Sequence, residues 1–439
     1  MISPKAISSG GFLYSHRPDA RGFRTLSDMA YNGIHMANTN LTSAKKAKND
    51  EFYTQFPDIQ KEMEAYLEYD PDTFRGKVVY CNCDDPFESN FFRYFVLNFN
   101  RLGLKQLITT SYKPSPIANT QLSLIPGVEE KTVEKGRPKA TANKFIINEV
   151  GDTNGDGSFG LPDIAEQLMT NKNNEWAPLT GDGDFRSEEC VELLKQADIV
   201  VTNPPFSLFR EYVAQLVEYG KKFSIIGNMN AITYKEIFPL IKDNKMWLGK
   251  GFKRSCAHFF SPFKSESKWL EEAQFKKLGI PIPDGLYVTR VAGIHWFTNL
   301  DHGRRHQPLS LMTMADNQKF NKKVQKSDTA YKKYDNYDAI EVPFTDAIPS
   351  DYDGVMGVPI SFLDKYSPEQ FEILGMCENE DLYKMKTKIY TNQEKKDAYM
   401  AKFGKTGQYD LNASGVVYVN GLFEKVYQRI LLKNKEVRI

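Results

Sequence analysis

The segment Asp198–Phe206 places the strongest constraint on the fold of this chain, because a short apolar run ends directly in two prolines. The apolar run 199–201 is typical of a parallel strand that is covered on both faces of its sheet. Proline has no backbone N–H and a nearly fixed φ, so Pro204 and Pro205 end the strand at Asn203. The sequence therefore predicts an α/β fold in which a buried strand leads into a rigid polar turn.

A helix is predicted immediately after this turn. Ser207 is the expected N-cap, apolar residues follow at helical spacing, and Gly220 is placed to end the helix. A turn between a strand and a helix lies at the carboxyl edge of an open α/β sheet, where ligands bind. We therefore expect the turn from Asn203 to Phe206 to line a ligand site.

The residues of the turn favour a planar ligand that carries an amine. The side-chain oxygen of Asn203 and the carbonyl oxygen of Pro204 are rigid acceptors, which suit the exocyclic amine of adenine or a carboxamide. Phe206 offers a flat face for stacking, worth about 1–3 kcal/mol for a nucleobase. A Pro-Pro turn that only ends a strand is the alternative interpretation of the same residues.

A β-α-β unit is predicted upstream of this strand. The segments Lys77–Cys83 and Lys105–Thr110 have the pattern of core strands, and a helical repeat of apolar residues separates them. Asp84, Asp85 and Pro86 follow the first strand, at the same predicted edge of the sheet. These acids can accept hydrogen bonds from an ammonium group, and a role in capping the turn is equally consistent with their position.

The chain offers little evidence for a metal site. Asp152–Gly157 resembles the first half of a calcium-binding loop, with Asp163 at its twelfth position, but Phe159 and Pro162 occupy unsuitable positions and no entering helix is predicted. A turn rich in glycine and aspartate is the preferred interpretation, and no metal is expected. His295 is expected to be a packed or surface histidine rather than a catalyst.

The length of 439 residues is sufficient for two or three folded units. No stretch of 18 consecutive apolar residues occurs, so we expect neither a membrane span nor a signal peptide, and a cytoplasmic location. The five cysteines lack C-x-x-C spacing and are expected to be reduced and structural.

Positive charge is concentrated in two segments, although the net charge of the chain is only +1. Residues 1–50 hold seven Lys and Arg against three Asp, and residues 301–336 hold eight against four. Tyr331 and Tyr334 are interleaved with the second group. Such segments either contact nucleic-acid phosphates or remain solvated surfaces, and charge alone does not distinguish the two.

Taken together, these motifs resemble those of the EcoRI-type group of adenine-specific DNA methyltransferases, which use S-adenosylmethionine. The Asn203–Phe206 turn resembles their catalytic motif, and Asn49–Gln55 resembles their N-terminal cofactor motif. Further matches are Asp85-Pro86 to an acid-proline pair, Asp184-Phe185 to the element that holds the cofactor's adenine, and the segments Ile294–Asp301 and Met356–Tyr366. Phe87–Asn90 replaces the usual glycine-rich turn, and no ribose ligand is assigned.

The resemblance implies a Rossmann-like methyltransferase sheet with helices on both faces, plus a C-terminal target-recognition region. It divides the chain into a basic arm (1–48), a catalytic domain (49–300), and a target-recognition and C-terminal region (301–439). The residues implied for each role are Asn203, Pro204, Pro205 and Phe206 for catalysis; Phe52, Tyr53, Thr54, Asp85, Pro86, Asp184 and Phe185 for cofactor binding; and Arg304, Arg305, Lys322 and Lys323 for DNA binding.

The implied reaction is site-specific methylation of adenine N6 after the base has been flipped out of the duplex. The implied partners are double-stranded DNA and, within a restriction-modification system, a cognate endonuclease that acts on the same site. The chain itself is expected to be a monomer. Methylation of RNA or of a protein glutamine, and a catalytically silent DNA-binding module, are the alternatives that the residues leave open.

Overall fold

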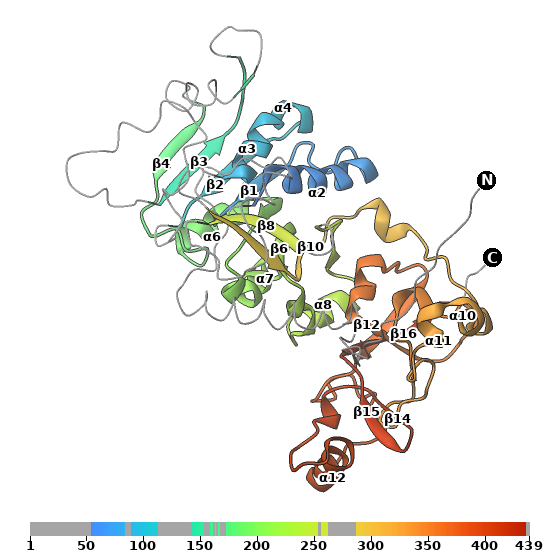
Figure 1. Cartoon of the computed structure of the whole chain (residues 1–439). Coiled ribbons are helices and arrows are strands. Elements are labelled where there is room, and N and C mark those ends of the chain that lie inside the picture. The colour runs from blue at the N-terminus through green and yellow to red at the C-terminus, as the bar shows by residue number, and fades with distance from the viewer. Residues whose placement is uncertain are drawn as a thin grey trace, which may run out of the picture.

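The computed structural model of the chain describes residues 54–83, 89–112, 142–152, 159–160, 163, 166, 173–252, 256–261 and 287–435. Figure 1 shows two lobes, of which the larger contains the elements from α2 to β10 and the smaller the elements from α10 onward. Within the described residues, no helix combines the length and apolar character that crossing a bilayer requires.

An eight-stranded mixed sheet forms the centre of the larger lobe, with the strand order β4-β3-β2-β1-β5-β6-β10-β7. The four middle strands are parallel, and antiparallel strands extend the sheet on both sides. The strands are β1 Val78–Cys81, β2 Gln106–Thr110, β3 Asn143–Ile147, β4 Glu175–Pro178, β5 Ile199–Thr202, β6 Lys222–Asn228, β7 Trp247–Leu248 and β10 Ile294–Thr298. A separate hairpin consists of β8 Cys256–Ser261 and β9 Tyr287–Ala292.

Helices cover both faces of the eight-stranded sheet (Figure 1). On one face, α2, α3 and α4 pack with alternate strand side chains such as Val79 and Val201, and on the other, α6, α7 and α8 pack with Tyr80 and Val200. The helices are α2 Phe56–Tyr69, α3 Asn90–Leu97, α4 Phe99–Leu102, α6 Glu188–Gln196, α7 Phe209–Glu218 and α8 Phe238–Lys242, with the 3₁₀ turns η2 Phe206–Leu208 and η3 Met229–Thr233. The predicted α/β class is confirmed.

Two details of the predicted helices are wrong. Ser207 is not an N-cap, because it lies inside η2, where the amide of Leu208 donates to the Pro205 carbonyl at 3.0 Å and tightens the chain before α7 begins. The helix predicted between the first two strands is broken at Asn98, whose backbone leaves the helical conformation. The side chain of Asn98 donates to the Tyr94 carbonyl at 2.8 Å and so competes with the helical ladder.

The smaller lobe is organised around a four-stranded sheet with the order β11-β12-β16-β13. Its sheet strands are β11 Ile340–Glu341, β12 Met356–Pro359, β13 Phe371–Met376 and β16 Arg429–Asn434. The remaining elements are the hairpin β14 Val416–Val419 and β15 Leu422–Lys425, the helices α10 Met314–Phe320, α11 Lys322–Gln325 and α12 Asn392–Phe403, and the 3₁₀ turns η6 Thr345–Ala347, η7 Ile360–Lys365 and η8 Leu411–Ala413. The 3₁₀ turn η5 Gly303–His306 lies in the connection between the two lobes. Figure 1 places α12 and the hairpin at the tip of this lobe.

A buried ion pair lies inside the smaller lobe. Arg429 of β16 donates to the carboxylate of Glu341 of β11 at 2.6 Å, and the Glu341 side chain is fully buried. The hydroxyl of Tyr334 donates to the same carboxylate. Because each charge in this pair is compensated only by its partners, the pair fixes the position of β11 relative to β16.

Ionic contacts join the two lobes. Asp364 of η7 accepts hydrogen bonds from Arg304 at 2.6 Å and from the ring of His295 in β10 at 3.2 Å. His306 lies between Asp301 and Glu369 at 2.9 and 2.8 Å. His295 is 1% exposed, so the expectation of a packed histidine is confirmed, and its contact shows that it joins the sheet to the smaller lobe.

Candidate active site

The Asn203–Phe206 turn leaves the sheet at the carboxyl end of β5. All four residues of β5 are buried, which holds the start of the turn in the core, and Asn203 is itself only 7% exposed. Phe206 is half-buried and packs against the apolar cluster on the α2 and α3 face of the sheet. The turn therefore combines a buried amide with an aromatic ring that keeps part of its surface accessible.

The neighbouring strand β1 is tied to the same turn through Asn82. The hydroxyl of Thr202, the last residue of β5, donates to the Asn82 carbonyl, and the hydroxyl of Tyr212 in α7 donates to the Asn82 side chain. Cys83 follows with a positive φ of 73°, a conformation that L residues adopt rarely. The chain therefore turns sharply at the edge beside the Asn203 turn; Asp85 and Pro86, which come next, lie outside the described residues.

Of the three predicted cofactor-binding residues in the N-terminal motif, Thr54 is described by the structure, whereas Phe52 and Tyr53 lie outside the described residues. Thr54 is 2% exposed, and its carbonyl accepts a hydrogen bond from the Asn90 side chain of α3 at 2.8 Å. Its hydroxyl oxygen has no hydrogen-bond partner among the described residues. A buried polar atom without a partner is unfavourable, so this hydroxyl is suited to a ligand.

Asp184 and Phe185 lie beside the end of β2. Gly183 has φ 79°, and a Cβ at this position would come within 1.9 Å of the Ser111 carbonyl oxygen, so only glycine allows this close approach. Hydrogen bonds from Arg186 hold the pKa of Asp184 below its usual value, which keeps the carboxylate ionised. Phe185 is 5% exposed, and its ring packs edge-on against Tyr212 at 5.0 Å.

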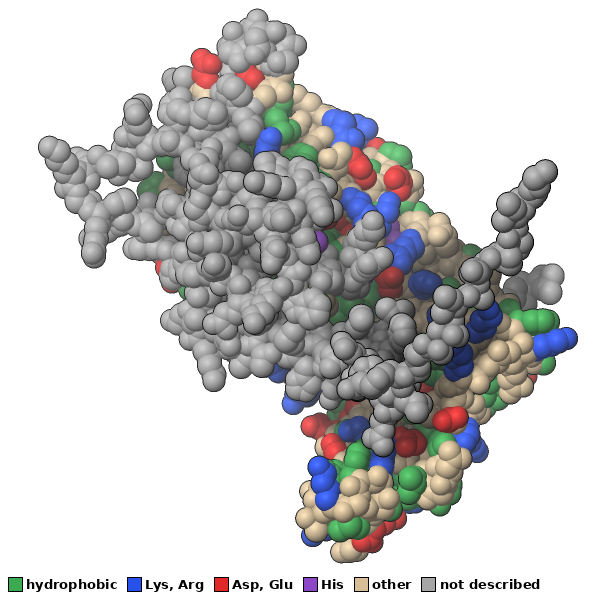
Figure 2. All heavy atoms as spheres, viewed as in Figure 1, with side chains coloured by type: hydrophobic (Ala, Val, Ile, Leu, Met, Phe, Trp, Pro, Cys, Tyr) green, Lys and Arg blue, Asp and Glu red, His purple; other side chains and the backbone are tan. Residues whose placement is uncertain are grey.

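The four predicted DNA-binding residues divide into two pairs. Lys322 and Lys323 of α11 are exposed, and Lys323 forms a surface ion pair with Asp346 at 2.7 Å. Arg305 is 6% exposed and stacks over the Trp247 ring at 3.9 Å, while Arg304 is held by Asp364. Figure 2 shows Lys and Arg side chains over the part of the smaller lobe that contains α10 and α11. The lysines therefore lie on the surface, whereas the arginines are held by residues of β7 and η7.

Sequence reasoning missed Glu62, which organises the loop after β7. Its carboxylate is buried and accepts from the amides of Lys250 and Gly251 at 3.0 and 2.8 Å and from the Tyr66 hydroxyl at 2.6 Å. A Cβ at Gly249 would lie 1.9 Å from this carboxylate. The signal available in the sequence was an acid between Ile59 and Tyr66, on the apolar face of a predicted helix.

The segment once compared with a calcium loop is only partly described. Asp163 is buried, and its carboxylate accepts from the Gly160 amide at 2.7 Å, which is the contact of a turn. In the part of the chain that the structure describes, no three His, Cys, Asp or Glu side chains are grouped closely enough to hold a metal ion.

Comparisons with known proteins place these features in context. A family model described as adenine-specific methyltransferase EcoRI matches residues 40–435. Type II methyltransferase M.EcoRI of Escherichia coli is 44% identical over 337 residues, which cover 77% of this chain and 89% of that protein. M.MpnI of Mycoplasma pneumoniae is 35% identical over 361 residues, covering 82% and 93%, and M.MgeORF184P of Mycoplasma genitalium is 33% identical over 398 residues, covering 91% and 99%. No solved structure matches the chain.

Proposed function

The chain belongs to the EcoRI family of adenine-specific methyltransferases, and on this premise we propose that it transfers a methyl group from S-adenosylmethionine to the N6 amine of one adenine in a specific duplex DNA site. The relatives are named Type II methyltransferases, which supports a role in restriction-modification beside an endonuclease that acts on the same site. We propose that the chain acts as a monomer.

The observation that carries this proposal is the pairing of β1 with β5. The two strands are parallel and hydrogen-bonded neighbours, so the chain segments that follow them leave the sheet side by side. One segment leads to Asp85-Pro86, and the other is the Asn203 turn. Asn82 connects the two strand ends directly. A cofactor held by the first segment and a base held by the second would thus meet at one edge.

The residues present fit the proposed cofactor. The hydroxyl of Thr54, which has no partner among the described residues, can donate or accept a hydrogen bond, and the ionised carboxylate of Asp184 can accept one. We propose that Phe52, Tyr53, Asp85, Pro86 and Phe185 complete the cofactor site. S-adenosylmethionine supplies an electrophilic methyl group on a sulfonium centre. Arg186 already donates a hydrogen bond to each carboxylate oxygen of Asp184. Asp184 would therefore accept a hydrogen bond from an adenine amine through the remaining lone pair of one of these oxygens.

The Asn203 turn supplies the orientation that the reaction needs. The lone pair of the adenine amine is delocalised into the ring, so the amine is a weak nucleophile. Acceptors at the Asn203 side chain and the Pro204 carbonyl would hold its two N–H groups and favour a pyramidal nitrogen, whose lone pair then points at the methyl carbon. The rigid Pro205 keeps these acceptors in place, and Phe206 would stack on the flipped base.

We propose that the eight-stranded sheet is a Rossmann-like methyltransferase sheet and that the smaller lobe recognises the target. The parallel order β2-β1-β5-β6 supports the first part, and the exposed lysines of α11 support the second. The corresponding domains are a basic arm (1–48), a catalytic domain (49–300) and a recognition region (301–439). Arg305 is not retained among the DNA contacts, because its burial leaves it out of reach of a phosphate.

The decisive experiment is a transfer assay with S-adenosylmethionine that carries a labelled methyl group. DNA, RNA and protein should be offered separately as acceptors, and the labelled DNA digested to nucleosides. We expect label in N6-methyladenine from duplex DNA alone. Label in RNA or in protein glutamine would replace the proposal with one of the other methyltransferase activities, and no transfer to any acceptor would indicate a silent binding module.

Replacing the proposed cofactor ligands should weaken cofactor binding. Asp184→Ala and Asp85→Ala should each raise the dissociation constant for S-adenosylmethionine by about tenfold, because one hydrogen bond to a carboxylate contributes roughly 1.5–3 kcal/mol. Calorimetric titration measures this constant. Asp243→Ala, at an exposed position after α8, is the control. Parent-like affinity in both variants would show that these acids do not hold the cofactor.

The exposed lysines of α11 should contribute to DNA binding through phosphates. Replacing Lys322 and Lys323 with alanine should weaken binding to every DNA sequence and reduce the slope of log affinity against log salt by up to about two. Fluorescence anisotropy at several salt concentrations measures the slope. The control pair is Lys242, the last residue of α8, and Lys245, which follows shortly after that helix. An unchanged slope would assign the α11 lysines to the solvated surface.

A further inference from the structure

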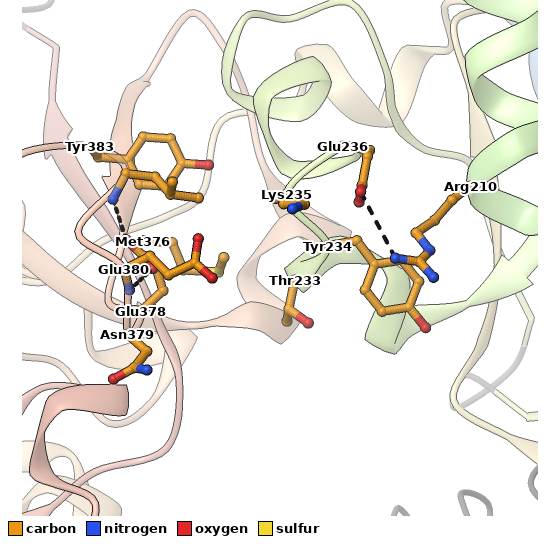
Figure 3. Close-up of a pocket in the computed structure, with 11 residues that line it drawn as sticks. Arg210, Thr233, Tyr234, Lys235, Glu236, Met376, Glu378, Asn379, Glu380 and Tyr383 are labelled. Atoms are coloured by element: carbon orange, nitrogen blue, oxygen red, sulfur yellow. Dashed lines mark hydrogen bonds and ion pairs between the residues drawn. The ribbon is translucent and has the colours of Figure 1, made fainter.

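A cavity of about 280 Å³ lies between the two lobes, beside the end of the larger sheet where β5 and β6 finish. One wall is formed by Arg210 in the first turn of α7 and by residues 233–236, which follow β6 through η3. The opposite wall is formed by Met376 at the end of β13 and by residues that follow it. Figure 3 shows Arg210, Tyr234 and Lys235 facing Glu380 and Tyr383 across the gap. Because α7 follows the Asn203 turn and β6 pairs with β5, this wall of the cavity comes from the same edge of the sheet as that turn.

The wall that belongs to the larger lobe is suited to a nucleic-acid backbone. The Arg210 side chain is 57% exposed, its only charged contact among the described residues is a long one to Glu236 at 3.8 Å, and its guanidinium lies 5.3 Å from the ring centre of Tyr234. Tyr234 is itself 36% exposed. A cation and an aromatic face beside each other form a common arrangement for binding phosphates and unstacked bases.

The opposite wall presents an exposed leucine on a rigid loop. Leu382 lines the cavity and is 49% exposed. On either side of the pair Leu382-Tyr383, Asp381 and Lys384 have positive φ values of 53° and 54°, in the left-handed region that L residues adopt rarely. Non-glycine residues persist in this region only where the surrounding contacts enforce it, and such strain is concentrated at functional sites.

Side-chain carboxylates enforce the shape of this loop. Glu378 accepts from the amides of Glu380 and Leu382 at 2.6 and 2.5 Å, and Asp381 accepts from the amides of Met385 and Lys386 at 2.9 and 3.1 Å. Four backbone donors are thus satisfied within a nine-residue segment. The ring of Tyr383 anchors the loop on Phe238 of α8 at 5.4 Å. An apolar side chain is therefore held out toward solvent, at a fixed place, by a loop with little freedom to withdraw it.

We propose that Leu382 is a wedge that enters the DNA base stack as the target adenine leaves it, while Arg210 and Lys235 hold phosphates of the adjoining backbone. This inference rests on the proposed function, and it places the DNA backbone next to the flipped base at the mouth of the cavity. Apolar side chains that enter a base step stabilise an unstacked duplex, because they cover the base surfaces that the departing base exposes. The Leu382 side chain would lose its own exposed surface in the same step.

The test uses two versions of a duplex that the parent enzyme methylates. One carries adenine at the target position and gives the methylation rate, and the other carries 2-aminopurine at the same position and reports flipping only. Leu382→Ala should lower the flipping signal and slow single-turnover methylation by about tenfold, and pairing the target with a mismatched base should restore the rate to within about twofold of the parent. Leu382→Met keeps a long apolar side chain and should retain most of the activity. Ile389→Ala, at a 68% exposed position in the same lobe, is the matched control.

Two results would overturn the wedge. One is a Leu382→Ala rate equal to that of Ile389→Ala, and the other is an equal loss on paired and mismatched targets, which would indicate an ordinary DNA contact. In both cases the parent enzyme still methylates adenine, so the proposed function stands. A parent enzyme that transfers no methyl group to DNA would remove the proposed function and this inference with it.

Discussion

Asn203→Ala is expected to slow methylation by about two to three orders of magnitude while leaving the affinities for cofactor and DNA within about twofold. This is the size of effect that follows when one preorganised partner of a transition state is removed. The Asn203 oxygen matters most as the amine becomes pyramidal, so its loss should act on the rate of transfer and little on binding. Single-turnover kinetics, with binding measured separately, test the expectation.

Phe206→Ala provides the internal comparison, because the Phe206 side chain offers an aromatic face for stacking and no hydrogen-bond acceptor. Loss of stacking worth about 1–3 kcal/mol should reduce the population of the flipped base, and a mismatched target should partly restore the rate. Ser207→Ala changes an exposed neighbour in the same turn and is the control. The catalytic assignment of the turn is wrong if a mismatched target restores the methylation rate of Asn203→Ala as fully as that of Phe206→Ala. It is also wrong if neither variant methylates DNA more slowly than the parent enzyme.

Glu341→Ala is expected to destabilise the smaller lobe by about 3–5 kcal/mol, because it leaves the Arg429 guanidinium buried without its partner. Replacing both residues, as Glu341→Leu with Arg429→Met, should be far less harmful than either single change, since no uncompensated charge remains. Denaturant unfolding followed by a probe in the smaller lobe measures the free energy of unfolding. A double variant as unstable as Glu341→Ala would show that the charge itself is not the cause.

The central part of the fold could be predicted because its signals are local. The strand Ile199–Thr202 is a continuous apolar run stopped by prolines. The strands Val78–Cys81 and Gln106–Thr110 lie within the two segments predicted upstream of it. The parallel pairing of the first two strands follows from the length of the connection between them. Each of these features depends on residues close together in the chain.

The parts that could not be predicted depend on contacts between distant segments. Arg305 was expected at the DNA because it lies in a basic segment, but the Trp247 ring that covers it lies far earlier in the chain. Glu62 accepts hydrogen bonds from backbone amides almost 190 residues away in the chain, and no local sequence pattern predicts such partners. The same holds for the Asn203–Phe206 turn, since its motif does not predict the hydrogen bond between Thr202 and Asn82.

The pairing of β1 with β5 has a consequence for how enzymes of this kind can diversify. Neighbouring strands in a sheet are about 4.8 Å apart, so under the proposed function the separation of methyl donor and acceptor is set by a backbone ladder. No described strand of the smaller lobe belongs to that ladder. Under the proposed role of this lobe in target recognition, its loops can accumulate substitutions that change which DNA sequence is bound, while the distance between methyl donor and acceptor is inherited unchanged. Sequence preference and chemical rate then become separately evolvable traits, and a change in one need not be compensated in the other.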